Sequence, residues 1–152
     1  MSLRFREEIQ ALSRPLVVGA DRRIDVVAAL IADSSGQLLL GRRPAGRPMA
    51  GYWEFPGGKR AAGEAREDAL GRELREELGI HVVAAEPFMQ LEHSYPDVEV
   101  ALDVWRIADY RGVPAALEGQ ELRWVAKSEL ANVDLLPADW PIVERLLRAD
   151  VD

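Results

Sequence analysis

The chain of 152 residues contains no cysteine, which excludes disulfide bonds, thiol catalysis and zinc sites built from thiolates. Basic residues are also in deficit, because 19 Lys and Arg stand against 26 Asp and Glu and give a net charge of −7. A nucleic-acid-binding surface and a surface for anionic membranes both need a basic face, so neither partner is expected. An anionic small substrate remains compatible if the site supplies local cations or a metal ion.

Long apolar runs are absent as well, since none approaches the roughly 20 residues of a membrane-spanning helix. The first residues, MSLRFREEIQALSRP, carry charges where a signal peptide has its apolar stretch. We therefore expect a cytoplasmic protein without membrane association. The length fits one domain, and 48% hydrophobic residues suffice for one core. We expect residues 1–22 to be an N-terminal extension with a short helix at 4–13, and residues 23–150 to form a single domain.

Short apolar runs separated by turn residues predict several strands, at 24–32, 37–43, 53–59, 81–95, 98–110 and 121–126. The first two runs flank the turn sequence DSSG and are expected to form a hairpin. Residues 64–78 are expected to form a helix that Gly79 stops, and a closing helix is expected after Asp139. Hairpins imply antiparallel pairing, so the predicted fold class is α/β, with a mixed sheet flanked by helices.

Three glutamates of the helix at 64–78, Glu73, Glu76 and Glu77, lie within one turn of each other, where like charges repel. The apolar stripe of this helix consists of three leucines, Leu70, Leu74 and Leu78. At 100° per residue, Glu77 lies about 20° from the edge of the stripe and Glu73 about 40° further round. A hard divalent cation such as Mg²⁺ would relieve the repulsion. The alternative is an ordinary solvated helix with incidental charge clustering.

Neighbouring features favour the metal site. Gly71 lies in mid-helix at a cost of about 1 kcal/mol relative to alanine, which predicts the close approach of another group. A Gly-Gly pair precedes Lys59, which combines flexible backbone with a cation at the mouth of the same unit. Glu64 opens the helix, where the dipole favours a carboxylate, and its spacing also allows it to hold Arg72.

The same stretch resembles the Nudix box: a glycine, five residues, a glutamate, seven residues, then Arg-Glu-apolar-x-Glu-Glu-x-Gly-apolar. The matching positions are Gly58, Glu64, Arg72, Glu73, Leu74, Glu76, Glu77, Gly79 and Ile80. At roughly 7% per residue type, chance agreement is on the order of 10⁻⁸ per start position. The resemblance implies an α/β/α sandwich around a mixed sheet. It also implies hydrolysis of a diphosphate linked to another group, usually a nucleoside, with Mg²⁺ or Mn²⁺.

The resemblance further assigns roles to residues of the box. The implied metal ligands are the carbonyl of Gly57 and the side chains of Glu73, Glu76 and Glu77. Metal ions at this place would neutralise the charge of a polyphosphate and lower the pKa of the attacking water. We expect Glu73 to orient or deprotonate that water, although family members differ in which carboxylate is the base. Arg72 and Glu64 are expected to support the ligands.

Four segments outside the box, WEFPGGK, SYPD, EGQELRW and LLPADWPI, resemble the MutT branch, which hydrolyses oxidised nucleoside triphosphates to the monophosphate and pyrophosphate. By this resemblance Glu118 adds a metal ligand; the alternative is a simple loop charge. Arg43 and Lys59 are expected to contact phosphates, and strand alternation lets only one of Arg42 and Arg43 face the site. Phe55 is expected either to enclose the base or to lie in the core.

Asp139 departs from the MutT pattern, which has an asparagine there and reads oxidised guanine. Asparagine both donates and accepts hydrogen bonds, whereas an ionised aspartate only accepts. A carboxylate suits the exocyclic amine of cytosine, and the PAD segment is similar to that of CTP pyrophosphohydrolases. The alternative is that Asp139 only caps the last helix. Val98 stands where MutT has an arginine, so one nucleotide contact is lost.

We therefore predict a Mg²⁺-dependent pyrophosphohydrolase of MutT type that acts on 8-oxo-dGTP or related oxidised nucleoside triphosphates. A CTP or modified-dCTP pyrophosphohydrolase is the main alternative. Hydrolysis of ADP-ribose or dinucleoside polyphosphates is less favoured, because Tyr95 and Pro96 fit MutT equally well. A catalytically silent nucleotide-binding module is disfavoured because no carboxylate of the box is missing. The expected partner is a nucleoside triphosphate, and the sequence does not predict an oligomeric state.

Overall fold

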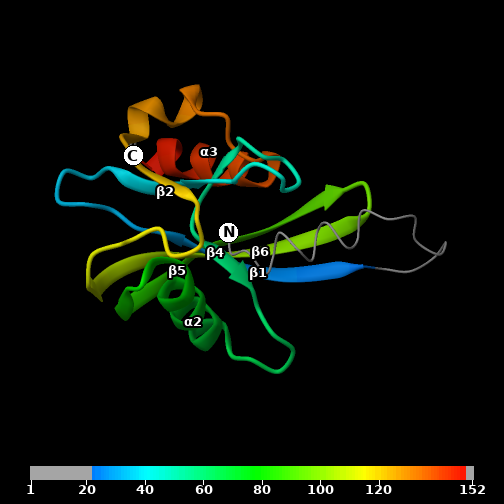
Figure 1. Cartoon of the computed structure of the whole chain (residues 1–152), viewed down its shortest axis with the longest axis horizontal. Helices are drawn as coiled ribbons and strands as arrows, with labels where there is room; N and C mark the ends of the chain where they lie inside the picture. The colour runs from blue at the N-terminus through cyan, green and yellow to red at the C-terminus, as the bar shows by residue number, and fades with distance from the viewer. Residues whose placement is uncertain (1–21, 150–152) are drawn as a thin grey trace.

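The computed structural model describes residues 22–149, so the helix expected at 4–13 lies outside the described residues (Figure 1). One sheet has the strand order β4-β1-β6-β5, formed by Gly57–Lys59, Arg23–Leu30, Val98–Arg111 and His81–Tyr95. The other has the order β3-β2-β7, formed by Trp53–Glu54, Leu38–Arg42 and Glu121–Val125. The helices are α2 (Arg66–Leu78), the 3-10 helices η1 (Lys127–Asn132) and η2 (Pro137–Asp139), and α3 (Trp140–Ala149). None of these helices is long and apolar enough to span a membrane.

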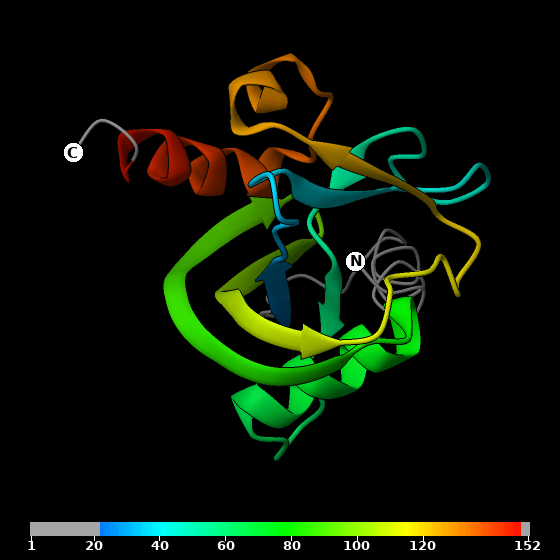
Figure 2. The same ribbon diagram turned by 90° about the vertical axis from the view of Figure 1, so that its left-hand side faces the viewer.

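The four-stranded sheet is mixed, as predicted. Strand β1 pairs with β6 in parallel and with β4 antiparallel, while β5 and β6 form a long antiparallel pair. Figure 2 shows that β5 and β6 curve strongly and that α2 lies on one side of this sheet. The three-stranded sheet, the 3-10 helices and α3 lie on the other side. The layers therefore correspond to the predicted α/β/α arrangement.

The core consists of two apolar clusters, one on each side of the four-stranded sheet. Successive side chains of a strand point to opposite faces, so Val26 belongs to one cluster and Val27 to the other. The cluster around Val27 contains the leucine stripe of α2, with Leu70, Leu74 and Leu78 fully buried. The helix is thus fixed by the stripe that the sequence pattern predicts, and its neighbouring glutamates are carried to the sheet.

One prediction about the strands is confirmed over a short length and another is wrong in detail. The predicted hairpin forms around the antiparallel bridge of Ala32 with Leu38, with the N–H of Leu39 donating to the carbonyl of Ile31, after which β2 joins the other sheet. The short strand and glycine turn expected at 53–59 are two strands in different sheets, because Phe55 and Pro56 carry the chain across and the glycines belong to β4. Proline has no N–H for a strand ladder, and the N–H of Phe55 is donated to the side chain of Asp139. Helix α2 begins at Arg66, two residues after the predicted start.

Candidate active site

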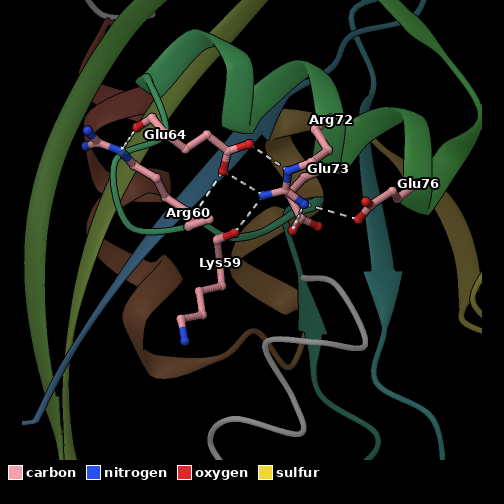
Figure 3. A network of polar contacts seen from close by, with 7 residues as sticks. Lys59, Arg60, Glu64, Arg72, Glu73 and Glu76 are labelled. Carbon is pink, nitrogen blue, oxygen red and sulfur yellow. Dashed lines mark hydrogen bonds and ion pairs between the residues drawn. The ribbon is translucent and has the colours of Figure 1, made fainter.

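Arg72 is the centre of a polar network on the inner side of α2 (Figure 3). Its Nε and Nη2 donate to the two carboxylate oxygens of Glu64, at 2.7 and 2.9 Å. Nη2 also donates to the carbonyl of Lys59 at 3.0 Å, while Nη1 donates to Glu73 at 2.9 Å and to Glu76 at 3.2 Å. Hydrogen bonding to Glu64 is the main reason that the pKa of Arg72 lies above its usual range. Glu64 thus holds Arg72, as the spacing predicts.

Two of the three clustered glutamates are buried, with Glu73 at 0% and Glu77 at 1% exposure. Both lie next to the leucine stripe, so the packing of α2 carries them out of water. The Oε2 atom of Glu77 accepts the N–H of Gly57 at 3.0 Å. Burial raises the pKa of Glu77 to about 7, and the charges of Glu54 and Glu118 act in the same direction. Glu77 therefore exchanges its proton close to neutral pH.

Gly57 allows β4 to lie directly against β1. A Cβ atom at this position would be 1.9 Å from the carbonyl oxygen of Val27, a distance no side chain can adopt. This close packing presents the N–H of Gly57 to Glu77 and thereby joins the sheet to α2. The requirement for glycine here comes from the approach of another backbone.

Gly71 does not have the role that the sequence predicted. Apart from its own helix, a Cβ atom there would meet no atom of the described residues within 4 Å, so no group packs closely against this position. Gly71 instead borders a surface hollow that is also lined by Glu64 and Arg72 of the polar network and by His81 and Val82 of β5. The helical pattern alone could not distinguish close packing from open solvent at this position.

Glu118 lies near the C-terminal end of α2, as expected if it belongs to the same site as Glu77. Its charge contributes to the raised pKa of Glu77. The backbone N–H of Glu118 donates to the side chain of Gln120 at 3.0 Å, and Gln120 in turn donates to the carbonyl of Glu77 at 3.2 Å. Gln120, which is almost fully buried, was not among the predicted site residues.

Arg42, the last residue of β2, and Arg43, which follows it, face opposite ways, as strand alternation predicts. Arg43 is 1% exposed and donates from Nη1 to Glu54 at 3.1 Å and from Nε to the carbonyl of Pro48 at 2.8 Å. In the described part of the chain its Nη2 atom has no hydrogen-bond partner. The side chain of Arg42 is 50% exposed and pairs with Glu121 at 3.7 Å. Glu54 was not among the predicted site residues; its signal in the sequence is a carboxylate between two aromatic residues, Trp53 and Phe55.

Asp139 is the last residue of η2 and is 1% exposed. Its Oδ2 atom accepts the N–H of Phe55 at 3.1 Å, while its Oδ1 atom has no partner among residues 22–149. Burial raises its pKa from 3.8 to about 7, and the negative charge of Glu54 adds to this shift. The side chain therefore links two distant segments, and it carries a proton in a large fraction of molecules at neutral pH.

The other two predicted substrate contacts have different outcomes. The ring of Phe55 is fully buried and belongs to the apolar cluster around Val26, which confirms the core alternative. Lys59 supplies its carbonyl to Arg72, and Figure 3 shows its side chain extending away from Glu73 and Glu76. A phosphate contact by Lys59 stays a prediction.

The donor set fits a hard divalent cation, although the side chains are turned to other partners. Across residues 22–149, no three Asp, Glu or His side chains gather closely enough to hold a metal ion. Arg72 takes one oxygen from Glu73 and one from Glu76, and Gly57 donates to one oxygen of Glu77. Carboxylates and a nearby backbone carbonyl are the ligands that Mg²⁺ and Mn²⁺ prefer. Metal binding requires at least some of these side chains to turn.

Comparison with known proteins agrees with this geometry. A family model described as NUDIX domain matches residues 27–145. The chain is 39% identical over 126 residues to the CTP pyrophosphohydrolase of Escherichia coli (strain K12), covering 83% of this chain and 93% of that protein. It is 34% identical over 127 residues to the 8-oxo-dGTP diphosphatase of the same strain, covering 84% and 98%. The crystal structure of the MutT protein from Methanosarcina mazei Go1 matches with a TM-score of 0.76 and 30% identity, over 87% of this chain and 98% of that chain.

Proposed function

The chain belongs to the Nudix family of hydrolases, and from this premise we propose that it is a nucleoside triphosphate pyrophosphohydrolase of MutT type. Its proposed substrates are 8-oxo-dGTP and related oxidised nucleoside triphosphates, which it cleaves to the monophosphate and pyrophosphate. The observation that carries the proposal is the buried pair Glu73 and Glu77 of α2, with Glu73 bound by Arg72 and Glu77 bound by Gly57 of β4.

The residues of the site have distinct proposed roles. Mg²⁺ or Mn²⁺, when bound, would neutralise phosphate charge and make water a better nucleophile at neutral pH. The proposed ligands are the carbonyl of Gly57 and the side chains of Glu73, Glu76, Glu77 and Glu118. Glu73 orients or deprotonates the attacking water, while Arg72 holds Glu73 and Glu76 in place. Lys59 is proposed to contact the phosphates, and so is Arg43 through its Nη2 atom, which has no hydrogen-bond partner among the described residues.

Asp139 is proposed to read the base. Protonated, it both donates and accepts, and it can then bind O6 and N7–H of 8-oxoguanine in the manner of an asparagine. Its raised pKa supports this possibility, because the protonated form is well populated at neutral pH. Ionised Asp139 instead accepts from the amine of cytosine. This chemistry, together with the CTP pyrophosphohydrolase relative, favours CTP or a modified dCTP as the second candidate substrate.

The decisive experiment measures pyrophosphate release with Mg²⁺ across a panel containing 8-oxo-dGTP, CTP, 5-methyl-dCTP, ADP-ribose and a dinucleoside polyphosphate. We expect 8-oxo-dGTP to give the highest kcat/KM. The ratio of kcat/KM for 8-oxo-dGTP to that for CTP should fall from about pH 6 to about pH 8, as Asp139 ionises. A ratio cancels the titration of groups that both reactions share.

Asp139→Asn provides the matched control, because asparagine donates and accepts at every pH. In this variant the ratio should rise and lose its pH dependence. If the substitution changes neither substrate's kcat/KM, the base-reading role of Asp139 is wrong. If the folded protein turns over no member of the panel, the alternative of a silent nucleotide-binding module replaces the enzyme proposal.

A further inference from the structure

Residues 115–120 form a loop that closes the C-terminal end of α2. The last carbonyl groups of a helix have no partners within the helix itself. Here the N–H of Ala115 donates to the carbonyl of Leu78 at 3.0 Å, and the N–H of Leu117 donates to that of Glu77 at 3.2 Å. The carbonyl of Glu77 also accepts from the side chain of Gln120 at 3.2 Å. The loop is therefore bound to the helix end at which the proposed metal ligands lie.

Gln120 uses both ends of its amide in this arrangement. Its Nε2 donates to the carbonyl of Glu77, and its Oε1 accepts the N–H of Glu118 at 3.0 Å. The side chain is 3% exposed, so these two hydrogen bonds are shielded from water. The next residue, Glu121, opens β7 and pairs with Arg42 of β2. Gln120 is thus anchored to a sheet while it joins Glu77 to Glu118.

We propose that Gln120 is a positioning residue that keeps the Glu118 loop beside Glu77, so that both carboxylates act on the same bound cation. The inference rests on the proposed function, because it takes Glu77 and Glu118 as metal ligands. The hydrogen bond from Gln120 is not needed to give the last carbonyl groups of α2 a partner, since the carbonyl of Glu77 also accepts the N–H of Leu117. Loss of the Gln120 amide therefore affects the geometry of the site more than the closure of the helix.

The test is a double-mutant cycle on Mn²⁺ binding, with free Mn²⁺ measured by electron paramagnetic resonance. Gln120→Met keeps the length of the side chain and removes both hydrogen bonds. We expect it to weaken Mn²⁺ binding by about tenfold or more, as is typical when a group that orients a metal ligand is lost. Glu118→Gln should weaken binding to a similar extent. The double variant should bind only slightly more weakly than either single variant, because both changes remove the same ligand.

Controls separate positioning from folding. Gln37→Met, in the turn before β2, should leave the Mn²⁺ affinity unchanged. Thermal unfolding in EDTA should be similar for the parent protein and Gln120→Met. If Gln120→Met does not fold, Gln120→Asn replaces it, because its amide is one methylene too short to reach both partners. Asparagine at this position is likewise expected to weaken binding.

The outcomes distinguish this inference from the proposed function. Unchanged Mn²⁺ affinity in Gln120→Met, or losses that add fully in the double variant, would overturn the positioning role alone. Unchanged affinity in both Glu77→Gln and Glu118→Gln would overturn the proposed metal site and the positioning role with it. Weaker binding in all single variants, with a small further loss in the double variant, supports both.

Discussion

Asp139 makes the stability of the metal-free protein depend on pH in an unusual direction. Its pKa is about 7 in the folded chain and has an ordinary value of 3.8, so the folded state binds this proton more tightly than the unfolded state does. The contribution to stability is fully present below about pH 4 and is lost as the pH rises to about 7. A typical carboxylate in an ion pair has the opposite effect.

We predict that the metal-free protein is more stable at pH 5 than at pH 8, and that Asp139→Asn reduces this difference by roughly 1–3 kcal/mol. Asparagine retains an oxygen for the N–H of Phe55 and carries no charge into the core. Urea unfolding with EDTA at both pH values measures the effect. Equal pH dependence in the two proteins would show that Asp139 is ionised in the folded state throughout this range.

Glu77→Gln should separate catalysis from folding. The glutamine side chain retains an acceptor for the N–H of Gly57 but removes a buried charge from the proposed metal site. We expect turnover to fall by about 100-fold or more, while metal-free stability at pH 8 stays equal or increases. Glu67→Gln, on the exposed first turn of α2, is the control and should leave turnover unchanged. A large loss of metal-free stability in Glu77→Gln would instead identify a structural carboxylate.

Two ion pairs at the end of β2 differ mainly in burial. Arg43 and Glu54 are 1% and 0% exposed, whereas Arg42 and Glu121 lie on the surface. Glu54→Gln leaves the charge of Arg43 in the core without its counterion, and we expect a loss of about 3 kcal/mol. Glu121→Gln should change stability by less than about 0.5 kcal/mol. Urea unfolding of both variants provides the comparison, and similar losses would contradict it.

Helix α2 contains one position at which a substitution should increase the stability of the protein. Gly71 has helical neighbours on both sides and free space where a Cβ would lie. We predict that Gly71→Ala stabilises the protein by about 1 kcal/mol, because alanine loses less conformational entropy in a helix. Pyrophosphate release should be unaffected, since the added methyl group lies in open space and meets no residue of the proposed site. Gly57→Ala is the contrasting variant and should severely destabilise the fold, because its Cβ overlaps the carbonyl of Val27.

For the molecule as a whole, the sequence predicts those features that depend on residues close together in the chain. The helix at 66–78, its stop at Gly79, the leucine stripe and the pairing of Glu64 with Arg72 all follow from spacings within a few turns. The sequence did not predict which strands share a sheet, because the residues of a hairpin turn do not determine over how many residues the two strands remain paired. Gln120 was missed because its partner Glu77 is distant in the sequence, and Glu54 was missed because its ion pair with Arg43 forms between segments whose pairing the sequence did not predict.

The N-terminal boundary of the domain gives a prediction for the whole molecule. The family match begins at residue 27, and Ile24 is the first buried core residue of the described range 22–149. We expect a chain that starts at Arg22 to fold, because this residue still offers its carbonyl to the N–H of Glu99. The truncated chain should unfold cooperatively and cleave the same nucleotides as the full chain. Loss of cooperative unfolding on truncation would show that residues 1–21 belong to the domain.

The segment Phe55–Pro56, where the chain crosses between the two sheets, also sets the distance between two carboxyl groups. Two N–H groups of this short segment bind two distant carboxyls, with Phe55 donating to Asp139 and Gly57 donating to Glu77. Two residues of extended backbone span about 7 Å. The segment therefore fixes the distance between Asp139, which is proposed to read the base, and Glu77, which is proposed to act where the phosphate chain is cut. Inserting a single residue between Phe55 and Gly57 would leave both hydrogen-bonded carboxyl groups present but change the distance between them. The enzyme would then no longer hold the base and the phosphate chain of a substrate at the correct separation.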